Sequence, residues 1–259
     1  MKLQIVPART GWLWFKTGLR TFWSQPLALS GLFLMFLTAM SLASLLPYLG
    51  SALGLALLPA ATLGLMAATR EAESGKFPMP TILLSAFRAG RQRASAMGVL
   101  GAIYALGFLA VLGISALVDG GGFAKLYLAG GELTPELVQS SEFQLAMWIA
   151  MGLYLPLSML FWHAPALVHW HGISPGKSLF FSGVACVRSF GAMTVFTLAW
   201  IGLFLAIGLL LIVLASLLGL PDLLATLMFP AALLMGAMFF SSIYFSFRDS
   251  FVAETEVKP

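Results

Sequence analysis

Three histidines lie close together in the sequence and are the side chains that could bind a metal ion or a haem iron. His163, His169 and His171 follow one another at spacings of six and two residues. Two ligands share one face of a helix at a spacing of three or four, so these spacings scatter the rings. No carboxylate lies nearby in the sequence. We therefore predict no metal site and expect interfacial side chains at the end of a span, although the three histidines remain candidates for cofactor binding.

Cys186 is the only cysteine of the chain. No basic residue is placed to activate its thiol, and we expect it to be a small buried hydrophobic side chain. The sequence contains no Ser-His-Asp arrangement, no paired acids, no zinc signature and no phosphate-binding loop. We accordingly predict no catalytic residue, no cofactor and no enzymatic activity.

The composition indicates the elements that carry these residues. Of the 259 residues, 60% are hydrophobic and 9% are charged, whereas charged residues make up about 25% of a soluble domain. Six stretches without Asp, Glu, Lys or Arg are long enough to cross the hydrocarbon core. We predict an all-α integral membrane protein whose spans are 27–47, 48–69, 96–117, 143–168, 191–216 and 223–247.

The distribution of Lys and Arg predicts how the spans are oriented. Of the 14 cationic residues, all except Lys125 lie in the segments 1–26, 70–95 and 169–190 or in the C-terminal tail. Cationic loops remain in the cytoplasm, so both termini are expected there and the loop 118–142 is expected outside. The net charge of +4 thus belongs to membrane-flanking loops, and we predict no nucleic-acid partner.

A three-residue pattern precedes the first, third and fifth spans. It consists of a proline, a serine or threonine three positions later, and an arginine thirteen positions after the proline. The instances are Pro7-Thr10-Arg20, Pro78-Thr81-Arg91 and Pro175-Ser178-Arg188. The second span of each pair also contains a proline, namely Pro59, Pro156 and Pro230. We predict one membrane domain, 1–259, built from three parallel repeats of about 7–69, 78–168 and 175–247.

Each repeat is expected to begin with an amphipathic helix in the membrane plane. In the first helix, Gly11, Trp12, Phe15, Leu19, Phe22 and Trp23 are opposite Arg9, Thr10, Lys16, Thr17, Arg20 and Thr21, with Leu13 and Trp14 as exceptions. In the third helix, Leu179, Phe180, Gly183, Val184, Cys186, Val187 and Phe190 are opposite Lys177, Ser178, Ser182, Arg188 and Ser189. The second helix runs from Pro78 through Gly90 to Ala94. The apolar faces are expected to contact lipid, the protein's own surface, or both.

The segment 161–190, FWHAPALVHWHGISPGKSLFFSGVACVRSF, resembles an uncharacterised family of bacterial six-span inner-membrane proteins of the beta-proteobacterial type. The segment 64–88, with Arg70-x-x-Glu73-x-Gly75-Lys76 before Pro78, is similar to the same family. More loosely, a Pro-led helix before a span resembles the membrane domains associated with glycerophosphodiester phosphodiesterases. The resemblance implies a multi-pass protein of the bacterial inner membrane and supplies no catalytic residues.

Three functions are compatible with these features. The first is a non-enzymatic protein that organises lipid or a membrane-protein partner, favoured by short loops and basic, aromatic membrane-surface helices. The second is a permease or channel for a neutral or apolar solute or for lipid, with a cavity lined by Pro59, Pro156 and Pro230. The third is an intramembrane enzyme or haem protein, which only the histidines support. Membrane lipids are the expected partners in the first, and the sequence predicts no oligomeric state.

Overall fold

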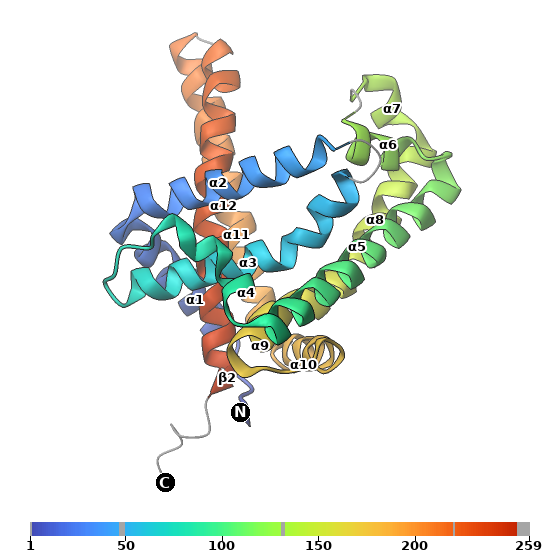
Figure 1. Ribbon diagram of the computed structural model, residues 1–259. Coiled ribbons are helices and arrows are strands. Elements are labelled where there is room, and N and C mark those ends of the chain that lie inside the picture. Colours follow the sequence, from blue (N-terminus) through green and yellow to red (C-terminus); the bar gives the residue numbers. More distant parts are fainter. Residues whose placement is uncertain (1, 47–49, 131–132, 220, 253–259) are drawn as a thin grey trace. The chain divides into compact units, whose positions relative to one another are not determined.

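The computed structural model describes residues 2–46, 50–130, 133–219 and 221–252. Six helices in this part of the chain are long and apolar enough to cross a membrane, which confirms an all-α membrane protein (Figure 1). They are α2 (Pro26–Ser44), α3 (Gly50–Glu73), α5 (Arg91–Asp119), α8 (Ser141–Phe161) with α9 (Ala164–His171), α11 (Phe190–Leu218) and α12 (Pro221–Ser250). The junction of the first two predicted spans, at 47–49, and the C-terminal residues 253–259 lie outside the described residues.

The helices belong to two compact units, which we describe separately. The first unit contains Met1–Thr38, Ala61–Arg88 and Val184–Pro259, and the second contains Ala39–Ala60 and Ala89–Gly183. The helices α2, α3 and α10 (Pro175–Arg188) therefore each contribute residues to both units.

The first unit is organised around α1 (Arg9–Ser24), which packs against α11 and α12. Two glycines make this contact close. A Cβ atom on Gly11 would lie 2.9 Å from the backbone nitrogen of Phe196, and one on Gly18 would lie 2.7 Å from the Cα atom of Ser242. Small residues allow helices to approach closely in membranes, where apolar attraction between helices is weak. Gly11 and Gly18 therefore determine which face of α1 packs on these spans.

A short antiparallel strand pair joins the ends of the described chain. In β1 (Lys2–Leu3) and β2 (Phe251–Val252), Lys2 is opposite Val252 and Leu3 is opposite Phe251 (Figure 1). The Gln4 backbone nitrogen also donates a hydrogen bond to the Ser250 carbonyl oxygen at 2.9 Å. The two ends of the described chain therefore lie beside each other.

The second unit is built on α5, which packs along α8. Aromatic rings connect these spans with the loop helix α6 (Gly122–Ala129): Phe108 of α5 lies 5.8 Å from Tyr154 of α8 and 5.2 Å from Tyr127 of α6, centroid to centroid. The loop also contains α7 (Pro135–Gln139), where the Thr134 hydroxyl accepts a hydrogen bond from the Leu137 amide. Rings and a capped turn thus hold this loop against its spans.

The segment after Pro78 differs from the expected single helix. It forms the 3-10 helix η1 (Pro80–Leu84) and the four-residue helix α4 (Ser85–Arg88), and α5 begins at Arg91. Gly90 has a φ of +96°, a conformation that interrupts a helix and that few residues other than glycine adopt. The three repeats stay a prediction, because their second leading helix is divided.

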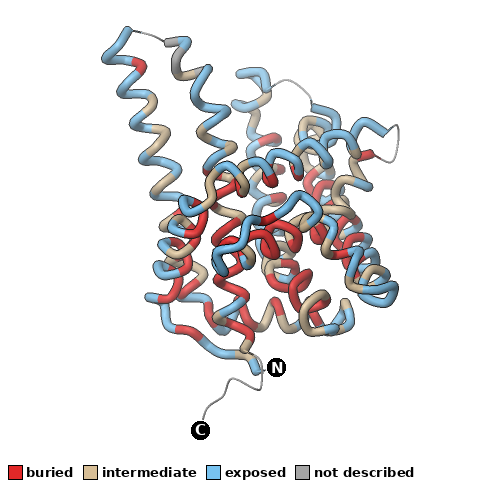
Figure 2. The backbone as a smooth tube through the Cα atoms, turned by 60° about the vertical axis from the view of Figure 1, so that its left-hand side comes forward, coloured by how far each residue is buried: buried red, intermediate tan, exposed pale blue. Residues whose placement is uncertain are grey.

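The C-terminal part of α11 and the N-terminal part of α12 are largely exposed. Between Leu205 and Leu234, only Ala215 is buried among the residues whose exposure is described (Figure 2). Such apolar, exposed surface on helices of this length is suited to contact with lipid hydrocarbon.

Candidate functional site

The three histidines do not form a shared site. His163 is buried at the break between α8 and α9, whereas His169 and His171 lie in the last turn of α9. Within the described ranges, no group of three or more His, Cys, Asp or Glu side chains is placed to hold a metal ion.

A hydroxyl from α10 supports the break beside His163. Ser182 Oγ donates a hydrogen bond to the Met159 carbonyl oxygen at 2.8 Å and accepts one from the His163 backbone nitrogen at 2.9 Å. Pro165 follows the break and has no N–H of its own, so this span loses a backbone hydrogen bond there. Ser182 thus supplies bonds that the interrupted helix cannot make by itself.

Cys186 is buried in α10. Burial raises the pKa of its thiol to about 12, because the thiolate is poorly solvated there. The side chain is therefore a neutral thiol under physiological conditions, as expected from the sequence.

The exposed face of α1 combines tryptophans with cations. Trp12 and Trp23 are 49% and 63% exposed, and they share this face with Arg9, Leu13, Lys16 and Arg20. The buried face consists of Thr10, Gly11, Trp14, Phe15, Gly18, Thr21 and Phe22. The buried face of α1 therefore takes residues from both predicted faces, and the amphipathic helix in the membrane plane stays a prediction.

The buried residues of α10 also come from both predicted faces. Its buried residues include Ser178, Ser182, Ala185 and Cys186, whereas Lys177, Phe180, Val187 and Arg188 are exposed. Small and hydroxyl-bearing residues face inward because they permit close contact and satisfy their hydroxyls with nearby carbonyl groups. Aromatic and cationic residues consequently share the outer face.

A polar network orients α1, and the sequence pattern did not reveal it. The indole Nε1 of Trp14 donates a hydrogen bond to Asp249 Oδ2 at 3.0 Å. The neighbouring Arg248 donates from Nε to Asp249 Oδ1 at 2.8 Å and from its guanidinium to Glu73 Oε1. Charges at the ends of α3 and α12 thus pair with each other and anchor Trp14. In the sequence, these charged residues are marked only by their positions at the ends of apolar stretches.

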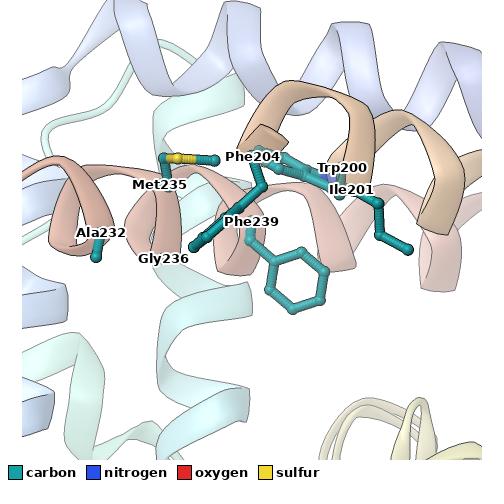
Figure 3. A pocket seen from close by; sticks show the side chains of 7 residues that line it. All are labelled: Trp200, Ile201, Phe204, Ala232, Met235, Gly236 and Phe239. Atoms are coloured by element: carbon teal, nitrogen blue, oxygen red, sulfur yellow. The ribbon is translucent and has the colours of Figure 1, made fainter. Parts of the chain in front are cut away.

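The first unit also contains an apolar groove of about 310 Å³ between α11 and α12. Figure 3 shows its lining, which is formed by Trp200, Ile201 and Phe204 of α11 and by Ala232, Met235, Gly236 and Phe239 of α12. The indole nitrogen of Trp200 donates a hydrogen bond to Ser242 Oγ at 3.2 Å, so this polar atom is satisfied within the protein.

The prolines expected to line a shared cavity do not have a common environment. Pro59 is buried, whereas Pro156 and Pro230 are exposed. None of the three lines the groove between α11 and α12.

A relative shows the family of the chain. The sequence is 41% identical over 254 residues to a probable inner membrane protein of Burkholderia thailandensis, and the match covers 97% of this chain and 94% of the relative. The chain belongs to this family of probable inner membrane proteins. No protein-family model and no solved structure matches it. The family confirms the expected inner-membrane protein, and the resemblance to phosphodiesterase-associated domains has no support.

Proposed function

We propose that this inner membrane protein is non-enzymatic and organises anionic phospholipid at the cytoplasmic surface of the membrane. The observation that carries the proposal is the exposed face of α1, on which Trp12 and Trp23 alternate with Arg9, Lys16 and Arg20.

The chemistry of this face suits the lipid headgroup region. Tryptophan is enriched at membrane interfaces because its ring is apolar and its N–H is polar. Lysine and arginine near the surface each contribute about 1 kcal/mol of attraction to anionic lipid. Cations avoid hydrocarbon, so Arg9 and Arg20 keep both ends of the exposed face of α1 at headgroup level. Lys177 and Arg188 beside the exposed Phe180 give α10 a similar surface.

The orientation of the chain belongs to the proposal. Both termini are placed in the cytoplasm, where anionic headgroups attract basic segments. The pairing of β1 with β2 supports this arrangement, because it holds the two ends together on one side.

The test compares lipid retention by the wild type and by a charge-depleted variant. Native mass spectrometry of protein in nanodiscs of phosphatidylglycerol and phosphatidylcholine measures which lipid stays bound. The wild type should retain phosphatidylglycerol preferentially. Replacing Arg9, Lys16 and Arg20 together by Gln should weaken that preference by roughly 100-fold, given about 1 kcal/mol for each cation.

Lys125→Gln is the matched control, because this exposed cation lies in the predicted outer loop. It should leave the preference unchanged. Equal retention of the two lipids by the wild type would contradict the proposal. A stoichiometric protein mass in place of lipid would favour the alternative of a membrane-protein partner.

A further inference from the structure

We propose that the groove between α11 and α12 holds one acyl chain of the phospholipid whose headgroup lies on the exposed face of α1. This inference rests on the proposed function and names the site that the lipid occupies.

The lining of the groove matches a hydrocarbon chain. The seven lining residues are Gly236 and six residues whose side chains are apolar except for the indole nitrogen of Trp200, which is already bonded to Ser242. A polar occupant would lose its hydrogen bonds with water and find no replacement in such a groove. A chain of methylene groups makes no such demand and gains dispersion contacts with the aromatic walls.

The size and the opening of the groove are suited to a single acyl chain. Its volume of about 310 Å³ is at the lower end of the roughly 300–1,000 Å³ of small-molecule sites. The ring of Phe33 from α2 lies beneath Gly236, where a Cβ atom would approach it to 2.7 Å. Ile201 and Phe204 are each about half exposed, so the wall that they form is open on its outer side. An acyl chain can therefore enter the groove laterally from the bilayer.

A continuous row of rings connects the groove with the headgroup face. The exposed Trp12 lies 5.1 Å from Phe15, Phe15 lies 5.1 Å from Trp200, and Trp200 lies 5.6 Å from Phe239, centroid to centroid. Lys16, one turn of helix after Trp12, is exposed on the same face. The groove therefore begins beneath a cationic surface that complements a lipid phosphate.

This continuity favours a lipid over a helix of a second copy. A helix is about 10 Å wide with its side chains, and an apolar helix would leave the cations of α1 without an anionic partner. A phospholipid joins an anionic headgroup to an apolar chain in one molecule, which is the combination that α1 and the groove present.

The test uses phosphatidylglycerol with a photoreactive diazirine within one acyl chain, in nanodiscs containing the full-length protein. Peptide mass spectrometry then maps the cross-links. Cross-links should concentrate at residues 200–204 and 232–239. Ala232→Leu fills the groove from its exposed edge and should lower this yield by about tenfold. Ala206→Leu adds the same volume at an exposed position of α11 outside the lining and should leave it unchanged.

Two outcomes would overturn the inference: cross-links spread evenly along α11 and α12, or a yield that Ala232→Leu does not change. The proposed function would survive either of these if the preference for phosphatidylglycerol persisted. Conversely, equal cross-linking in the groove by a phosphatidylcholine probe of the same chain would support the acyl-chain site and contradict the anionic headgroup preference.

Discussion

At the scale of single residues, small side chains decide which surfaces are buried. Gly11 and Gly18 leave no space for a Cβ atom against α11 and α12, and Trp14 packs beside them with its indole bonded to Asp249. The tryptophans on the opposite face, Trp12 and Trp23, remain exposed. A residue type alone therefore does not predict burial here, because the position of a glycine determines which neighbours can approach.

Cys186 provides a prediction at this scale. With a pKa of about 12, the thiol is about 10⁻⁴ ionised at pH 8, so N-ethylmaleimide should modify it very slowly in the folded protein. The rate should rise as the pH increases toward 12, because only the thiolate reacts. Mass spectrometry of the alkylated protein measures the rate, and protein unfolded in SDS is the control that should react rapidly. Fast modification of the folded protein at pH 8 would contradict the assigned burial.

At the scale of elements, α10 stabilises an interruption in the fourth apolar span. The chain between α8 and α9 cannot complete its helical hydrogen bonds, and Ser182 of α10 reaches the Met159 carbonyl and the His163 amide. A helix that follows the span in sequence thus contributes to the geometry of the span itself. The buried hydroxyls of α10 are structural groups, which explains why this face is turned inward.

A pair of serine variants tests this role. Ser182→Ala removes both hydrogen bonds to the interrupted span and should destabilise the protein by about 1–3 kcal/mol, since each hydrogen bond contributes about 0.5–1.5 kcal/mol. Ser178→Ala is the matched control, because this buried hydroxyl donates only to Pro175 of its own helix. Unfolding in SDS measures both changes. Equal effects of the two substitutions would contradict the role of Ser182.

At the scale of the whole molecule, two independent observations concern the sides of the membrane. The strand pair β1–β2 holds the ends of the described chain together, which is compatible with six helices that are long and apolar enough to cross a membrane. All Lys and Arg residues except Lys125 lie in the segments predicted to face the cytoplasm. The strand pair indicates that the two ends share a side, and the charge asymmetry predicts that this side is the cytoplasm.

Cysteine labelling tests this orientation. Lys125→Cys should react with a membrane-impermeant maleimide in intact spheroplasts, because the exposed residue is predicted to be outside the membrane. Lys76→Cys, also exposed, should react only after permeabilisation. The buried native Cys186 should contribute little background. The opposite labelling pattern would show that the chain has the inverted orientation.

The sequence by itself determined the class of protein and the positions of its six apolar helices. Crossing hydrocarbon requires about 20 consecutive apolar residues, a property of contiguous sequence that needs no tertiary contact. It also indicated the neutral character of Cys186 and the poor ligand spacing of His163, His169 and His171.

Only the tertiary structure decided which helix faces are buried. Helical periodicity separates residues by angle, but it does not say whether lipid or protein covers each face. The close approach at Gly18, the bond from Trp14 to Asp249 and the contact of Phe15 with Trp200 all join residues far apart in the chain. The groove between α11 and α12 arises in the same way, because its walls come from two spans whose separation and rotation are set by packing.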